Sequence, residues 1–217
     1  MAFKAVLFDL DGTLLNTLAD IGNAANRVLS DHGYPVHPLD AYRLFVGDGA
    51  RALIERIMPA DARNSDSVLR LLDAFRQAYA SSWNVETKPY DGIPEMLNQV
   101  RDTGVRMAVL SNKPHDFTQN CVSALLANWS FDAVYGMRDN VPKKPHPAGA
   151  VAIAREVGID ADHWLYVGDT GTDMQTAVAA GMFPLGVLWG FRDRNELEQN
   201  GAKALIAKPD QLVRFLT

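Results

Sequence analysis

The stretch "FDLDGTL", residues 8–14, places two acids one residue apart where an apolar run ends. The run that leads into it, "AVLF", is continuously apolar, which is typical of a strand covered on both faces of a sheet. Asp9 and Asp11 are followed at once by Gly12, a common turn residue. A buried strand is therefore predicted to end in paired carboxylates. Taken alone, the pair is equally consistent with a solvated turn.

Short apolar runs recur along the chain and alternate with segments of helical period. Runs such as "VRMAVLS", "WLYVG" and "PLGVLW" are too continuous for strands with one solvated face. Residues 93–100 and 150–157 repeat apolar side chains with a helical period. Gly104, Gly158 and Gly181 each separate a helical segment from the next run, as a left-handed helix cap would. This alternation predicts an α/β fold, a doubly wound parallel sheet with helices on both faces.

Residues 17–86 interrupt the alternation. They carry several helical periods in succession, with no convincing strand between them. The sheet pattern resumes after "KPYDG", where proline and glycine punctuate the return. We therefore expect an inserted all-helical domain over residues 17–86 and a core formed by residues 1–16 and 87–217.

Composition and charge narrow the functional class. Hydrophobic residues at 47% and charged residues at 22% are ordinary for a globular chain. The net charge of -5 comes without any basic block, so we expect no nucleic-acid partner. No apolar run approaches the roughly 18 residues that span a bilayer, and Cys121 has no second cysteine to pair with. The expected location is cytoplasmic, with no membrane association.

Polar side chains follow three of the predicted strands. Parallel sheets bind ligands beyond the carboxyl ends of their strands, so these residues are expected to converge. Asp9, Asp11 and Asp169 would place three carboxylates in one crevice, where they repel one another unless a cation or protons neutralise them. Oxygen ligands without a Cys or His cluster favour Mg²⁺ and hence phosphate chemistry. The residues are Asp9, Asp11, Ser111, Asn112, Lys113, Asp169 and Asp173.

Four motifs in this order, "DLDGT", "LSNK", "KKPHP" and "GDTGTD", resemble those of the haloacid dehalogenase-like hydrolase superfamily. The match covers essentially the whole chain, and residues 17–86 resemble its type I helical cap. The stretches "VGDGARALIER", "SNKP" and "WGFR" are most similar to the phosphoglycolate phosphatase branch. The resemblance implies a Rossmann-like core and a Mg²⁺-dependent phosphatase, with 2-phosphoglycolate as the first candidate for its substrate. The implied partner is a small phosphorylated metabolite, and the implied state is a monomer or homodimer.

The resemblance also implies roles for individual residues. Asp9 would be the nucleophile that forms an aspartyl-phosphate, and Asp11 the general acid and base. Mg²⁺ would be held by Asp9, by Asp11 through its backbone carbonyl, and by Asp169. Residues that would act on the phosphoryl oxygens are Lys144, Ser111 and Asn112.

Three positions leave a choice. The family places its lysine directly before proline, which favours Lys144 over Lys143. Asp173 lies at the start of a predicted helix, so it could complement the helix N-terminus, support the lysine, or do both. In the cap, Arg51 or Arg43 could pair with a substrate carboxylate through a planar guanidinium.

Several other activities share parts of this pattern. An inorganic pyrophosphatase or a sugar-phosphate phosphatase or mutase of the same superfamily would differ chiefly in the cap. A dehalogenase would need neither Asp11 nor Mg²⁺. From another class, a non-enzymatic receiver domain also accepts phosphate on an aspartate beside a Ser/Thr and a Lys. Such a domain is usually shorter and lacks a helical cap.

Overall fold

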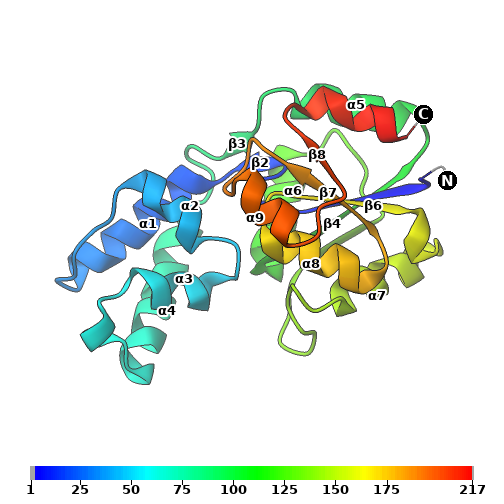
Figure 1. Cartoon of the computed structure of the whole chain (residues 1–217). Coiled ribbons are helices and arrows are strands. Elements are labelled where there is room, and N and C mark those ends of the chain that lie inside the picture. The colour runs from blue at the N-terminus through cyan, green and yellow to red at the C-terminus, as the bar shows by residue number, and fades with distance from the viewer. Residues whose placement is uncertain (1–2, 217) are drawn as a thin grey trace. The chain divides into compact units, whose positions relative to one another are not determined.

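The computed structural model describes residues 3–216 of the chain. It divides into two compact units, which are described separately (Figure 1). Unit 1 comprises Met1–Leu15 and Pro89–Thr217, and unit 2 comprises Asn16–Lys88. Unit 2 is thus inserted into unit 1 directly after the "DLDGTLL" stretch.

Unit 1 is built on a six-stranded sheet in the order β5-β4-β1-β6-β7-β8. Every neighbouring pair in it is parallel. The prediction of a doubly wound α/β fold is confirmed. The strands are β1 (Ala5–Phe8), β4 (Arg106–Pro114), β5 (Ala133–Met137), β6 (Trp164–Gly168), β7 (Phe183–Val187) and β8 (Ala204–Ile206).

Helices cover both faces of this sheet. One face packs on α7 and α8 through a core that includes Leu7, Tyr166 and Ile153. The other face carries α5 and the C-terminal 3₁₀ helix Pro209–Phe215, which contact each other (Figure 1). Left-handed glycines end α7 and α8, at Gly158 and Gly181. The helices are α5 (Ile93–Asp102), α6 (His115–Leu125), α7 (Ala148–Val157), α8 (Gly171–Ala180) and α9 (Arg194–Gln199), with a 3₁₀ turn at Ala161–His163.

The strand order reverses at β1, and in open parallel sheets ligands bind beyond the carboxyl ends of the strands at such a reversal. The chain passes from β1 to β4 and β5 on one side, then to β6, β7 and β8 on the other. Phe8 is in register with Val109 of β4 and Val167 of β6, so the three strands reach the same edge together. The Asp9 backbone N–H continues the ladder by donating to Val167 O at 2.9 Å. Residues just beyond these three strands must therefore meet.

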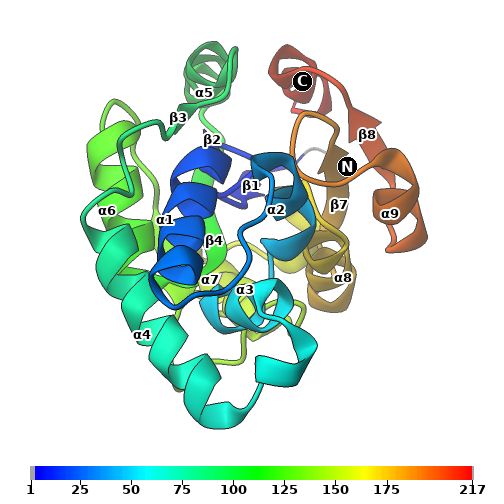
Figure 2. The ribbon, with the colours of Figure 1, turned by 90° about the vertical axis from the view of Figure 1, so that its left-hand side faces the viewer.

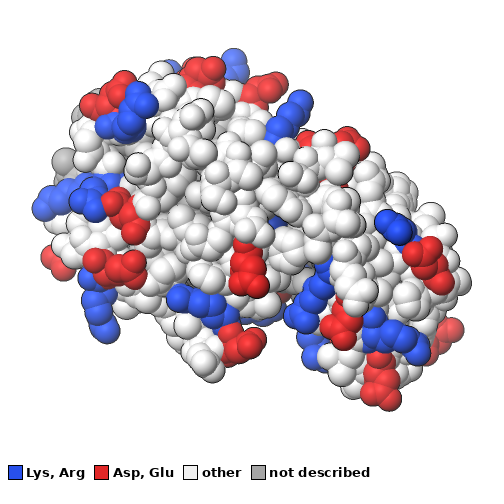
Figure 3. Space-filling view, turned by 180° about the vertical axis from the view of Figure 1, so that it is seen from behind, with Lys and Arg blue, Asp and Glu red and all other residues white. Residues whose placement is uncertain are grey.

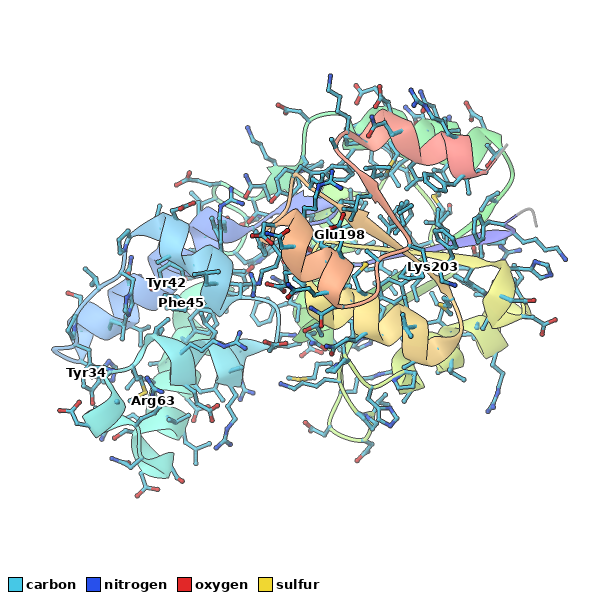
Figure 4. The ribbon with its side chains drawn as sticks, in the orientation of Figure 1. Tyr34, Tyr42, Phe45, Arg63, Glu198 and Lys203 are labelled. Atoms are coloured by element: carbon cyan, nitrogen blue, oxygen red, sulfur yellow. The ribbon has the colours of Figure 1, made fainter. Side chains whose placement is uncertain are left out.

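Unit 2 is helical. Its long helices α1 and α4 pack against each other, and α3 packs on α4 (Figure 2). Tyr42 is fully buried, and its ring lies 5.6 Å from that of Phe45, centroid to centroid (Figure 4). The elements are α1 (Leu18–Asp31), α2 (Tyr42–Phe45), α3 (Ala50–Ile57) and α4 (Ser65–Ala80), with 3₁₀ turns at Leu39–Ala41 and Ala60–Ala62. Two short strands, β2 (Leu15–Asn16) and β3 (Lys88–Pro89), pair in a separate sheet where the units join.

A buried carboxylate ties the beginning of unit 2 to its end. Asp20, on the first turn of α1, is 3% exposed. Its oxygens accept from the Glu86 N–H at 3.0 Å, the Thr87 N–H at 2.8 Å and the Thr87 hydroxyl at 2.7 Å. A buried carboxylate with this many donors is well compensated for its lost hydration. Asp20 therefore closes unit 2 across 67 positions of sequence.

The surface agrees with the absence of a basic block in the sequence. On the face shown in Figure 3, Lys and Arg side chains are interspersed with Asp and Glu. Among residues 3–216, none of the helices is both long and apolar enough to cross a bilayer.

Candidate active site

Asp9 lies directly after β1, at the point where the strand order reverses. It is 6% exposed, and Oδ1 accepts from Lys144 Nζ at 2.7 Å. Burial raises the pKa of Asp9 well above its usual range, and the charge of Asp173 raises it further, while Lys144 opposes both effects. The carboxylate is thus held by one ammonium in a site that otherwise disfavours its charge.

Lys144 brings that ammonium into the carboxylate cluster from the loop before α7. Its Nζ also donates to Asp173 Oδ1 at 2.6 Å and to the Leu110 carbonyl at 3.2 Å. Burial by itself would lower the pKa of Lys144, but Asp173 and Asp9 raise it well above the usual range. The side chain therefore stays charged. Of the two adjacent lysines, Lys144 is buried among these acids, and Lys143 is exposed at the surface.

Asp169 follows β6 and is completely buried. Its Oδ1 accepts from the Thr13 hydroxyl at 3.0 Å and its Oδ2 from the Phe191 N–H at 2.8 Å. The pKa of Asp169 is raised to about 7, mainly by burial and secondly by the negative charge of Asp173. The hydrogen bonds from Phe191 and Thr13 oppose this rise. Both oxygens are therefore oriented by donors from two separate loops.

Two glycines leave room for Asp169. A Cβ on Gly12 would lie 2.3 Å from Asp169 Oδ2, and a Cβ on Gly190 would lie 2.3 Å from Asp169 Cβ. Gly12 also has φ of +90°, which L side chains rarely adopt. The loop "WGFR" after β7 is further secured by Trp189, whose Nε1 donates to the Thr13 carbonyl at 3.0 Å. This loop and the turn after β1 thus enclose Asp169 together.

Asp173 makes both kinds of contact that its sequence position suggested. It is the third residue of α8 and completes a capping box with Thr170, whose hydroxyl donates to Oδ2 at 2.6 Å. Its Oδ1 accepts from Lys144 at 2.6 Å and from the Tyr166 hydroxyl at 3.3 Å. A helix terminus therefore fixes the carboxylate that positions Lys144.

The donor set fits a divalent cation. Oxygen atoms of Asp9, Asp169 and Asp173 all lie within 4.8 Å of one another. With all three acids ionised, their charges and the ammonium of Lys144 would leave two net negative charges, which the two positive charges of Mg²⁺ would balance, and hard oxygen ligands suit that ion. Of the expected ligand set, Asp9 and Asp169 belong to this cluster. For Asp11 the expected ligand was its backbone carbonyl, and its carboxylate contacts another residue.

The Asp11 carboxylate contacts Lys113, a residue to which the sequence analysis assigned no individual role. Its Nζ donates to Asp11 Oδ1 at 3.0 Å and Oδ2 at 3.2 Å, and the two side chains are 4% and 12% exposed. The sequence feature that could have indicated this contact is a lysine directly after Ser111 and Asn112, at the end of a strand predicted to be buried. A charged side chain in that place needs a partner nearby.

Ser111 and Asn112 lie in the last part of β4, the strand that pairs with β1, and both are buried. The Asn112 amide contacts the backbone of Lys144, with Oδ1 accepting from N–H at 2.9 Å and Nδ2 donating to the carbonyl at 3.1 Å. Ser111 Oγ accepts from the Lys113 N–H at 3.2 Å. Asn112 therefore holds the Lys144 segment in place.

The arginines considered for substrate recognition both belong to unit 2. Arg51 is on α3 and pairs with Glu55 at 2.9 Å, while Arg43 is on α2 and pairs with Asp40 at 2.9 Å. Both pairs join side chains three or four residues apart at the surface of their helices.

The arrangement in unit 1 suits phosphoryl chemistry. It presents a buried carboxylate beside a buried ammonium, a second carboxylate two residues on, and a carboxylate cluster able to bind a cation. A family model described as haloacid dehalogenase-like hydrolase matches residues 6–187. The chain belongs to the haloacid dehalogenase-like hydrolase family, as the motifs predicted.

Relatives and solved structures agree with this assignment. A phosphoglycolate phosphatase from Pseudomonas putida is 33% identical over 94% of this chain and 76% of its own length. One from Nitrosospira multiformis is 32% identical over 95% of this chain and 92% of its own. A structure from Lactobacillus delbrueckii subsp. bulgaricus has a TM-score of 0.93 at 28% identity, with 100% of this chain and 99% of that one covered. The prediction of a phosphatase-type hydrolase is confirmed.

Proposed function

We propose that this protein is a Mg²⁺-dependent phosphatase that hydrolyses 2-phosphoglycolate through an aspartyl-phosphate on Asp9. The observation that carries the proposal is the position of Asp9, directly after β1, where it contacts Lys144 and clusters with the carboxylates of Asp169 and Asp173. The printed names of the relatives, phosphoglycolate phosphatases, support the choice of substrate.

In the proposed first step, an Asp9 oxygen attacks phosphorus, and the bond between phosphorus and the ester oxygen breaks. Asp11 gives its proton to the leaving oxygen as that bond breaks. In the second step a water molecule attacks the phosphorus of the aspartyl-phosphate and passes a proton to Asp11. Asp9 is then released as a carboxylate, so that each acid returns to its starting state.

The remaining residues stabilise charge. Lys144 keeps its ammonium next to Asp9, and the Ser111 hydroxyl lies at the end of the adjacent strand. Asp9, Asp169 and the backbone carbonyl of Asp11 would hold Mg²⁺, which when bound stabilises negative charge on the phosphoryl oxygens. Such preorganised charge is usually the largest contribution to phosphoryl transfer. Direct contact of Asn112 with phosphate stays a prediction beside its contact with the Lys144 backbone.

Substrate choice is assigned to the helical unit. We propose that unit 2 acts as a cap over unit 1 and that Arg51 contacts the carboxylate of the substrate. The partner would be a small phosphorylated metabolite in the cytoplasm, and the protein a monomer or homodimer. Pyrophosphate or a sugar phosphate is the alternative substrate, because related enzymes of this superfamily share the same core.

The test is a phosphate-release assay with purified protein, with and without Mg²⁺. The substrates are 2-phosphoglycolate, p-nitrophenyl phosphate, pyrophosphate and β-glucose 1-phosphate. We expect metal-dependent release, fastest from 2-phosphoglycolate, and none above background from Asp9→Asn, which keeps the shape and removes the nucleophile. Equal release by Asp9→Asn would refute the mechanism, and unchanged turnover of 2-phosphoglycolate by Arg51→Ala would refute the role of Arg51.

A further inference from the structure

Glu196 joins two segments of the candidate active site, although it belongs to neither of them. It lies on α9, and its Oε1 accepts from the Gly171 N–H at 3.0 Å. Its Oε2 pairs with Arg192 Nε at 3.1 Å. Gly171 is the first residue of α8, and Arg192 is the last residue of the "WGFR" loop after β7. One carboxylate therefore connects the start of a helix to the end of a loop.

Both of these segments hold Asp169. On one side, Asp169 lies just before α8, which begins at Gly171. On the other side, the N–H of Phe191 donates to Asp169 Oδ2 at 2.8 Å, and Phe191 directly precedes Arg192. The two residues that Glu196 joins are thus close in sequence to Asp169 itself and to its hydrogen-bond donor.

The packing around these contacts leaves little free space. A Cβ on Gly190 would lie 2.3 Å from Asp169 Cβ, and a Cβ on Gly171 would lie 2.6 Å from Asn200 Nδ2, at the end of α9. The same Nδ2 donates to the Glu196 carbonyl at 2.8 Å. In a close-packed region, a shift of one group forces its neighbours to move. We therefore expect a change at Glu196 to reach Asp169 through the loop and the helix start.

A purely structural role for Glu196 is the alternative. An acid beside the first N–H of a helix complements the helix dipole, and an acid four residues after an arginine can form a surface ion pair. Glu198 makes a pair of this second kind with Arg194, and those side chains are 52% and 58% exposed. The side chain of Arg192, in contrast, is only 9% exposed. Glu196 thus engages a largely buried cation in the loop that contacts Asp169, which Glu198 does not.

We propose that Glu196 is a positioning residue for Asp169 and sets the affinity of the carboxylate cluster for a divalent cation. By holding Gly171 and Arg192 together, it keeps Asp169 oriented before a cation binds. Without Glu196, part of the binding free energy would be used to order these segments, so the affinity would fall. Nothing would block the native position of Asp169, so a saturating cation would still restore the site. This inference rests on the Mg²⁺ site of the proposed function.

The experiment measures Mn²⁺ binding to the purified protein without substrate, from the loss of the electron paramagnetic resonance signal of free Mn²⁺. Mn²⁺ has the charge of Mg²⁺ and also suits oxygen ligands, so added Mg²⁺ should displace it. We expect Glu196→Ala to raise the Kd of Mn²⁺ about 10-fold, the lower end of the range for groups that orient metal ligands. In the p-nitrophenyl phosphate assay the half-saturating Mg²⁺ concentration should rise by a similar factor, while kcat at saturating Mg²⁺ should change little.

Two further variants separate positioning from other effects. Glu198→Ala removes the same charge from the same helix and should leave the Kd of Mn²⁺ unchanged (Figure 4). It therefore controls for the general loss of a negative charge. Glu196→Gln keeps an oxygen that can accept from the Gly171 N–H and loses the charge that faces Arg192. It should raise the Kd by a smaller factor than Glu196→Ala, and it keeps the proposal testable where Glu196→Ala folds poorly.

The outcomes separate this inference from the proposed function. Unchanged Kd values in the folded Glu196 variants would overturn the positioning role, whatever their thermal stability. An equal rise in Glu198→Ala would also overturn it, because general charge would then explain the effect. If the Glu196 variants bind Mn²⁺ more weakly but the wild-type protein releases no phosphate, the positioning role stands and the phosphatase proposal fails. A wild-type protein that binds neither Mn²⁺ nor Mg²⁺ would overturn both.

Discussion

Gly190→Ala should abolish most of the activity while leaving the fold intact. The added Cβ would lie 2.3 Å from Asp169 Cβ, 2.5 Å from its Oδ2 and 2.5 Å from the Gly12 carbonyl oxygen. Ordinary contacts of a Cβ begin near 3.4 Å, so Asp169 or the loop has to move by about 1 Å. The carbonyl belongs to the backbone of the turn after β1, so this clash has no flexible side chain to absorb it.

A displacement of that size at a reacting group costs on the order of 100-fold in rate. The assay is kcat for p-nitrophenyl phosphate at saturating Mg²⁺, with thermal unfolding measured on the same samples. Gly104→Ala is the matched control, because nothing lies within 4 Å of its Cβ but its φ is +75°. That variant should lose about 1 kcal/mol of stability and keep its kcat. A folded Gly190→Ala protein with at least half of the wild-type kcat would refute the reasoning.

Three more changes test other parts of the structure. Asp20→Ala leaves the two buried donors of Thr87 and the part-buried N–H of Glu86 without their acceptor, so urea denaturation should show a loss of about 3 kcal/mol. Asp20→Asn keeps one acceptor oxygen and should show a smaller loss. Asn112→Ala removes both side-chain contacts to the buried Lys144 backbone and should lower kcat about 10-fold. It should also cost roughly 2 kcal/mol of stability, because two buried backbone groups lose their partners. An unchanged kcat in the folded variant would contradict the positioning role of Asn112. Burial raises the pKa of the Cys121 thiol to about 12, so the thiol should react with a thiol reagent at pH 8 only after the protein unfolds. Rapid reaction of the native protein would show that the segment around Cys121 opens to solvent.

Local patterns in the sequence were sufficient for the sheet and the family. Strands buried on both faces read as continuous apolar runs, and β1, β6 and β7 lie where "AVLF", "WLYVG" and "PLGVLW" predicted them. The positions of Asp9 and Asp169 at strand ends followed from those runs, because parallel strands place their carboxyl ends on one edge.

The partners of those acids could not be read from the same patterns. The Thr13 hydroxyl reaches Asp169 across 156 positions, and Lys113 reaches Asp11 across 102. The contact of the Asn112 amide with the Lys144 backbone was likewise not predicted, and its expected contact with phosphate stays a prediction. Contacts of this kind depend on strand register and on the path of each loop, which no short stretch of sequence encodes.

The sequence by itself therefore determined which chemical groups reach the edge of the sheet, since strand endings are a local property of the chain. Only the tertiary structure decided which ammonium faces which acid. In "FDLDGTL" the two aspartates look equivalent, but Asp9 is held by Lys144 and Asp11 by Lys113. The physical reason is that the two lysines come from different parts of the chain, Lys113 from β4 and Lys144 from the loop before α7, so the strand register and the path of that loop decide which acid each of them meets.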